Sequence, residues 1–408
     1  MFDIFKGHSK LTLFATILII FYGIYYMPID SFGMNAPIKM TLMVSSITVM
    51  FFYSFKASKA VLIGVIYLIY QYIVASYHPE SFRWSTYIYS ILLVLTYVSF
   101  YNLVFIERVF KIDHFINICK WFMMLYFVVC IVQQVLTLAG IGYFPLFNMM
   151  TNLNRGIGCQ SLSMEPSTFG RFMLVFYYAY IKCQEYKRDE GPFTLRELFE
   201  GEHKWVTIRF LWMMLTMGSG TAFVCLILLS LYFVRWHNWY YMIPTLIICY
   251  SLIQASGIEA LDRATSTIEA TTTLDKETVR ETDGSASVRI APLLNSLTAD
   301  FSKKETWFGY GIDSGLKDIH SRTMFHDYGF IYYIITLILS FSCGYNFWSL
   351  GSIFMFAGVG GSANGNIQYA WELMMVMTCV KYFYKNRYNP EIYEEEEEEE
   401  EEGNIEVA

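Results

Sequence analysis

Charged residues are scarce in this sequence. Asp, Glu, Lys and Arg make up 16% of its 408 residues, whereas a soluble domain has about a quarter. Hydrophobic residues make up 55%, and the mean hydropathy is +0.37. A chain of this composition would expose large apolar patches in water, so we exclude an ordinary soluble globular protein and predict an integral membrane protein. The 34 Phe, 32 Tyr and nine Trp residues are typical of membrane interfaces.

The chain also lacks an excess of positive charge. Its net charge is -7, and a run of nine Glu at 394–402 supplies that excess, so nucleic-acid binding has no electrostatic support. The eight Cys residues form no CxxC pair, which favours buried free thiols. Walker, zinc-ligand, nucleophile-elbow and GxGxxG patterns are missing, so we predict no cofactor and no metal.

Apolar runs of spanning length predict about twelve transmembrane helices and an all-α fold. Three of them, 168–182, 205–218 and 346–359, are shorter than the ~20 residues of a straight span. Each is either lengthened by flanking aromatics or is a packed interior helix. Lys10 leads directly into the first run, so we expect no cleavable signal peptide. The runs are 11–27, 38–55, 60–77, 85–106, 115–139, 168–182, 205–218, 221–235, 239–256, 324–342, 346–359 and 367–384.

Lys and Arg residues occupy alternate loops between these runs. The positive-inside rule places those loops, and with them both termini, in the cytoplasm. Two long loops, about 140–167 and 257–323, then lie at the outer face, and the second is expected to be partly helical. We predict one polytopic membrane domain over 1–385 and a disordered acidic cytoplasmic tail over 386–408.

The first candidate site residue is Glu165, where the first long loop re-enters the membrane. Pro166 suits the first turn of a helix, and Ser167 or Thr168 can satisfy its amides. Glu165 is either a general base or hydroxyl-orienting carboxylate, or simply an acidic residue that favours the helix dipole.

Arginines and one histidine are the other candidates. Arg155, Arg171, Arg263 and Arg289 lie at or near the predicted outer face, where arginine forks suit a lipid-linked phosphate. For Arg263 a solvated loop charge is the simpler interpretation, whereas Arg289 opens an amphipathic helix. His326 begins the tenth span and could transfer a proton, or it could be a structural interfacial residue.

Two glycine-rich segments also stand out. Trp307-Phe308-Gly309-Tyr310-Gly311 is typical of a tight turn that brings aromatics near the membrane surface. Gly218-Ser219-Gly220-Thr221 separates two short spans, either to let helices approach closely or to leave backbone amides for an anion.

Four patches, in order and spacing, resemble the Wzy-type polysaccharide polymerases and the related O-antigen ligases. They are Glu165-Pro166-Ser167-Thr168-Phe169-Gly170, Gly218-Ser219-Gly220-Thr221, Ser287-Val288-Arg289 followed by Trp307 to Gly311, and His326-Asp327-Tyr328-Gly329-Phe330. Gly220 stands where many relatives have arginine, and Asp327 stands where the family has asparagine.

The resemblance implies a GT-C-like glycosyltransferase in the bacterial inner membrane. Its substrates would be undecaprenyl-pyrophosphate-linked oligosaccharide repeat units, polymerised at the periplasmic face into O-antigen, capsule or exopolysaccharide by block transfer of the growing chain. A chain-length regulator and a flippase would be partners, and no metal is required. Arg289 would neutralise the leaving pyrophosphate, while Glu165 or His326 would orient or deprotonate the attacking hydroxyl. Trp307 and Tyr310, with Tyr143 and Phe144, could stack on sugars, and the remaining arginines would bind substrate.

Three alternatives stay open. An O-antigen ligase would transfer finished chains to a lipid A core and shares most of the motifs. A lipid-linked oligosaccharide transporter would tend to show internal repeats and mid-membrane polar sites, whereas the polar candidates here cluster at one face. A non-catalytic scaffold of an export assembly is the third.

Overall fold

The computed structural model describes residues 3–5, 7–24, 36–141, 158–163, 165–188, 191–233, 299–311, 324–359 and 368–393. Within them the chain is helical and has no strand, which confirms the all-α prediction for this part. The predicted span at 239–256, the sugar-stacking candidates Tyr143 and Phe144, and the acidic run at 394–402 lie outside the described residues.

Every other predicted span corresponds to a helix. These are α1 (Lys10–Gly23), α2 (Ala36–Tyr53), α3 (Lys59–Tyr77), α4 (Trp84–Phe105), α5 (Ile112–Leu138), α6 (Pro166–Lys187), α7 (His203–Thr216), α8 (Gly220–Phe233), α14 (Met324–Leu339) with the π-helical turn η7 (Ser340–Gly344), α15 (Leu350–Val359) and α16 (Gln368–Asn386). Short elements are η1 (Asp3–Phe5), η4 (Glu197–Phe199), α13 (Lys304–Phe308) and η8 (Pro390–Ile392).

Four helical segments are long and apolar enough to cross a membrane: Lys59–Tyr77, Trp84–Phe105, Ile112–Leu138 and His326–Gly344. Apolar helices of 10–17 residues add Lys10–Gly23, Ile38–Tyr53, Gly220–Phe233 and Leu350–Val359. On α3, Leu62, Val65, Ile66 and Ile69 are exposed, a surface suited to lipid rather than water. The chain therefore has the character of a membrane protein, with fewer full-length spans in its described part than the twelve predicted.

Small polar side chains cap two of the helices and join others to each other. Ser9 and Ser58 cap α1 and α3 by accepting hydrogen bonds from Thr12 N and Val61 N. Between α2 and α4, the Ser99 hydroxyl donates to the Ser46 carbonyl at 2.7 Å. Such small polar residues let apolar helices approach and bond without large side chains.

Helices α6 and α16 form the centre of the bundle. Nearly every residue of both is buried, and α6 packs against α5, α8 and α16. The predicted 168–182 segment is thus the middle of a longer, packed interior helix. Hydropathy understated its length because two charged residues, the half-buried Lys182 and the buried Glu185, pair with each other near its end.

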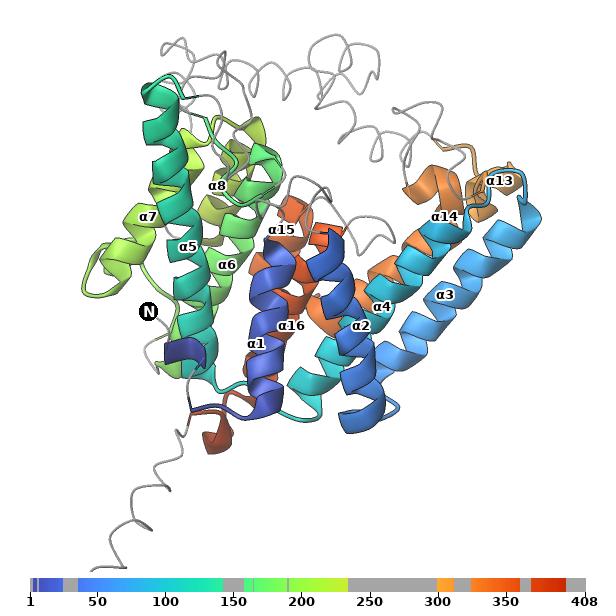
Figure 1. Cartoon of the computed structure of the whole chain (residues 1–408), viewed down its shortest axis with the longest axis horizontal. Coiled ribbons are helices and arrows are strands. Elements are labelled where there is room, and N and C mark those ends of the chain that lie inside the picture. Colours follow the sequence, from blue (N-terminus) through green and yellow to red (C-terminus); the bar gives the residue numbers. More distant parts are fainter. Residues whose placement is uncertain are drawn as a thin grey trace, which may run out of the picture.

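The two ends of the bundle differ in their charges. At one end, which we call the basic end, ion pairs join the loops: Lys56 to Glu107, Arg108 to Glu391 and Lys187 to Asp113. Figure 1 shows η1 and η8 at this end, and α13 with the start of α14 at the opposite one. We call the opposite end, where α6, α14 and α16 begin, the site end. The basic loops that these ion pairs join thus share one end, whereas the predicted basic loop with Arg235 lies outside the described residues.

The chain beyond α16 starts with a packed turn. η8 follows α16 closely, and the Tyr393 hydroxyl donates to the Tyr186 carbonyl at 2.9 Å. Lys111 donates to the Glu391 carbonyl at 2.6 Å. Residues 387–393 therefore dock on the basic end.

Candidate functional site

Glu165 is the N-cap residue of α6, with an extended backbone at φ -151° and ψ 159°. Pro166 occupies the first turn, where its missing N–H costs nothing. The expected cap by Ser167 or Thr168 is not formed. Instead the Ser167 hydroxyl donates to the Glu165 carboxylate, so the helix start holds and orients this carboxylate.

Arg171 lies just inside α6 and is 7% exposed. Its Nη1 donates to the Tyr369 hydroxyl of α16, and its guanidinium lies 5.1 Å from the centre of that ring. Its Nε has no hydrogen-bond partner among the described residues, and no carboxylate of that part of the chain forms an ion pair with it. Burying a cation is costly unless an opposite charge pairs with it. The lack of an acid partner in the described chain therefore makes Arg171 a candidate for binding an anionic group.

A second buried charge, Glu372 of α16, lies one helical turn after Tyr369. It is fully buried, and within the described residues neither carboxylate oxygen has a hydrogen-bond partner. Gly23 makes room for it, since a Cβ there would overlap the carboxylate. Lys39 of α2, 4% exposed, lies close enough to interact electrostatically with Glu372.

The sequence analysis missed both Glu372 and Lys39. Each sits within an apolar run that was counted only as a span. The signal was available, because an ionisable residue inside a membrane segment is a functional candidate by default.

His326 belongs to a separate cluster at the start of α14. Its ring stacks on Tyr310 with the ring centres 4.6 Å apart and the planes 16° apart. Its Nδ1 lies 3.2 Å from Asp327 Oδ1. Asp327 can therefore fix the imidazole tautomer that leaves Nε2 as the basic nitrogen.

Two glycines let the two backbone segments of this cluster come into close contact. Gly309 has φ +79° and Gly329 has φ +77°, and a Cβ on either one would overlap the backbone of the other's segment. The Tyr310 N–H donates to the His326 carbonyl at 2.9 Å, and the Gly311 N–H donates to the Asp327 carbonyl at 3.0 Å. The turn predicted at Trp307 to Gly311 thus pairs with the histidine motif.

Three aromatic rings pack together on the segments that carry these two glycines. Phe301, Trp307 and Phe330 form a triad with ring centres 5.2–5.6 Å apart. Trp307 and Tyr310 remain 37% and 46% exposed. They can present ring faces to a ligand.

Glu165 and His326 occupy the same end of the bundle, with no contact between them in the described chain. Aromatic residues join α14 to α16 through α3: the Tyr332 hydroxyl of α14 donates to the Tyr67 hydroxyl of α3, and the Tyr67 ring lies 5.8 Å from the Trp371 ring of α16. Arg155, Arg263 and Arg289 lie outside the described residues, so their placement relative to these clusters stays a prediction.

The Gly218-Ser219-Gly220-Thr221 segment lies at the turn from α7 into α8. Gly218 has φ +67° and turns the chain between α7 and α8. Gly170 of α6 faces Ala222 so closely that an added Cβ would lie 3.3 Å from the Ala222 Cα. These small residues bring α8 against α6 beside Arg171.

The basic end holds a cavity of about 230 Å³ between α6, α15 and α16. Two lysines line it, and both are already engaged. Lys381 donates to the carbonyls of Phe341, Ser342 and Tyr345, and Lys182 donates to Glu185 at 2.6 Å and to the Tyr232 hydroxyl at 3.2 Å.

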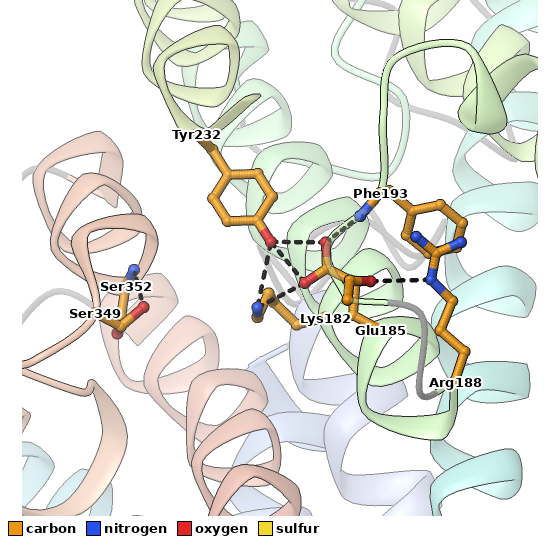
Figure 2. Close-up of polar contacts among 8 residues, drawn as sticks. Lys182, Glu185, Arg188, Phe193, Tyr232, Ser349 and Ser352 are labelled. Atoms are coloured by element: carbon orange, nitrogen blue, oxygen red, sulfur yellow. Dashed lines mark hydrogen bonds and ion pairs between the residues drawn. The ribbon is translucent and has the colours of Figure 1, made fainter. Parts of the chain in front are cut away.

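Figure 2 shows the neighbouring Glu185 network. The Glu185 carboxylate accepts hydrogen bonds from the Phe193 N–H at 2.9 Å and from Tyr232 at 2.7 Å. Arg188 lies over the Phe193 ring at 3.8 Å. This satisfied network anchors the loop after α6 and is structural, so we place no chemistry there.

No protein-family model, curated protein or solved structure matches this chain, so the interpretation of the site rests on its own geometry.

Proposed function

We propose that this chain is a metal-independent membrane glycosyltransferase that polymerises oligosaccharide repeat units carried on a lipid pyrophosphate. The observation that carries the proposal is Arg171, a cation that is buried at the site end and has no acid partner in the described chain. A pyrophosphate group would supply the missing counter-charge. The four sequence patches that resemble Wzy-type polymerases support the same chemistry.

The proposed reaction transfers a glycosyl group. The acceptor sugar hydroxyl attacks the anomeric carbon of the donor, the bond from that carbon to pyrophosphate breaks, and the lipid pyrophosphate leaves. His326 takes the hydroxyl proton, because Asp327 lies 3.2 Å from its Nδ1 and would orient the ring. The Ser167 hydroxyl holds the Glu165 carboxylate at the helix start, which suits Glu165 to orient the acceptor hydroxyl.

Binding the leaving group is assigned to arginine. Arg171, with the predicted contribution of Arg289, would stabilise charge that develops on the pyrophosphate in the transition state. Trp307 and Tyr310 would stack on the sugars, and the apolar exposed helices would accommodate the prenyl tails. An inner-membrane location with this end at the periplasmic face belongs to the same proposal.

The test is a gel profile of surface polysaccharide from a strain that carries variants of the gene. Glu165→Gln, His326→Ala and Arg289→Ala should each leave single repeat units in place of a ladder. His78→Ala is the matched control, because His78 lies at the same end and the variant keeps the Cβ that faces Gly311. Normal ladders from all three variants would refute the site.

The same profile separates the ligase alternative. Loss of a polymerase collapses the ladder to one repeat, whereas loss of a ligase leaves full-length polymer that is not attached to the lipid A core. The partners named by the resemblance, a chain-length regulator and a flippase, are proposed only with the polymerase.

One observation favours a second candidate function, a transporter of lipid-linked oligosaccharides. Buried ionisable residues such as Glu372 and Lys39 often mark transport pathways. Proteoliposomes that contain the chain alone would decide: translocation of a labelled lipid-linked oligosaccharide without extension identifies a transporter, and extension identifies a polymerase.

A further inference from the structure

A pair of buried cysteines holds the segment that leads into the Glu165 helix. Cys130 of α5 and Cys159, six residues before Glu165, bring their sulfur atoms to 3.1 Å. Cys130 is fully buried and Cys159 is 5% exposed. The other described cysteines show no sulfur–sulfur approach of this kind.

The backbone around this pair is fixed by hydrogen bonds from α5. The Gln133 side chain pairs with both backbone groups of Ser161: its Oε1 accepts from the Ser161 N–H at 2.8 Å, and its Nε2 donates to the Ser161 carbonyl at 3.0 Å. The Ser161 hydroxyl donates to the Tyr126 carbonyl at 2.7 Å. These contacts set the two sulfurs at a defined separation.

Ser161 also adopts an unusual backbone conformation. Its φ of +52° lies in the left-handed region that non-glycine residues rarely adopt. Such a conformation persists only where the surroundings enforce it, and here Gln133 and Tyr126 do so. The segment 158–163 is therefore docked on α5 at a conformational cost, and a covalent link would offset part of that cost.

We propose that Cys130 and Cys159 form a disulfide that fastens segment 158–163 to α5. A disulfide requires the two sulfurs about 2.05 Å apart, so closure needs a shift of about 1 Å. The predicted topology places this segment at the outer face, and the space beyond a bacterial inner membrane is oxidising.

The oxidant is an external disulfide, carried by a thiol oxidoreductase or a small thiol. The Cys159 thiolate, at the more exposed position, attacks the external disulfide and releases one thiol. The Cys130 sulfur then attacks the Cys159 sulfur of the mixed disulfide and releases the second thiol. Two protein thiols become one disulfide, one external disulfide becomes two thiols, and the two thiol protons end on the released thiols.

The disulfide would restrict the motion of segment 158–163, which leads to Glu165. It cross-links the chain across the 142–157 region and fixes the approach to Glu165, with Tyr126 and Gln133 as the docking surface. The disulfide rests on the outer-face location that belongs to the proposed function. It adds no group to the reaction, so its failure would leave the proposed glycosyl transfer untouched.

The test uses the full chain in its native membrane. Membranes are denatured in acid, free thiols are blocked with a maleimide, and peptides are analysed by mass spectrometry without reduction. The expected result is a Cys130 peptide linked to a Cys159 peptide, with Cys225 of α8 blocked by the maleimide in the same sample. Maleimide on both Cys130 and Cys159, or a link from either to another cysteine, would overturn the proposal.

A second measurement follows the consequence. In Cys130→Ser, amide hydrogen exchange over residues 158–163 should accelerate on the order of tenfold or more, because the opened segment is no longer tethered. Cys225→Ser is the matched control and should leave this exchange unchanged. Equal exchange in Cys130→Ser and the unaltered chain would also overturn the proposal.

Discussion

The two ends of the bundle treat their buried charges in opposite ways. At the basic end, Glu185 accepts from Lys182, Tyr232 and the Phe193 N–H, and each of these charges has its partner. At the site end, Arg171 has no acid partner among the described residues. Glu372 interacts electrostatically with Lys39 but has no hydrogen-bond donor in the same part of the chain. Satisfied networks stabilise a fold, whereas unsatisfied buried charges are retained at a cost in stability.

This contrast separates structural from functional residues without reference to relatives. Both ends are polar and both contain buried cations, so polarity alone does not locate the site. The distinction is whether the protein itself supplies a hydrogen-bond or ion-pair partner for each buried charge. Arg171 has no acid partner among the described residues, and an anionic substrate could supply one.

The largest expected change in stability comes from Glu372. Glu372→Ala leaves the buried Lys39 without its carboxylate and should lower the free energy of unfolding by about 3–5 kcal/mol. Thermal unfolding in detergent measures this. The double variant Glu372→Met/Lys39→Met removes both charges and should recover most of the loss. If Glu372→Ala alone is as stable as the unaltered chain, the two residues do not form a pair.

Arg171→Met tests whether the site end carries the activity. Polymer formation should fall on the order of 100-fold, the size of effect seen when one charge-stabilising group is removed. Stability should stay equal or rise, since a buried cation with no acid partner in the described chain is replaced by an apolar side chain of similar length.

Lys182→Met, at the basic end, is the control for Arg171→Met. It should reduce stability, because Glu185 loses its cation, while each folded molecule stays active. Equal losses of activity in the two variants would show that the basic end contributes to the reaction as much as the site end does.

Glu185→Gln tests the structural assignment of the basic end. Three donors to a charged carboxylate would be weakened, so stability should fall by about 1.5–3 kcal/mol. Ladder length from the folded fraction should be unchanged. A shortened ladder at full expression would show that this end takes part in the reaction.

The smallest effect concerns pH at the loop that follows α6. Hydrogen bonds from the Thr194 hydroxyl and N–H, and from Arg188, lower the pKa of Glu197 from 4.5 to about 2. Because the folded pKa is depressed, its contribution is present above pH 4.5 and is lost as the pH falls towards 2. The protection of the Thr194 amide, which is its exchange rate compared with the intrinsic rate at the same pH, should therefore fall over that window. Glu197→Gln should abolish the step, and a step that persists in this variant would assign it to another group.

Sequence alone located the helices well, because long apolar runs leave few other structures in a membrane. It did not give the true extent of α6 (Pro166–Lys187), where Lys182 and Glu185 neutralise each other inside the bundle. Hydropathy counts each of them as a polar residue and cannot register their pairing.

The site itself was only partly predictable. Glu165, Arg171 and His326 could be selected by their positions beside spans. The stacking of His326 on Tyr310 could not, because it depends on Gly309 and Gly329 meeting across separate segments. Glu372 was not predicted because one carboxylate barely alters the hydropathy of an apolar run. The approach of Cys159 to Cys130 could not be predicted either, because it depends on how the loop folds.

The most direct test of the central claim is reconstitution of the purified chain with an oligosaccharide repeat unit on a polyprenyl pyrophosphate. We expect the unaltered chain and Glu185→Gln to extend the repeat unit into a ladder and to release polyprenyl pyrophosphate, whereas Arg171→Met and His326→Ala should do neither. Extension by Arg171→Met and His326→Ala at the rate of the unaltered chain would contradict the central claim.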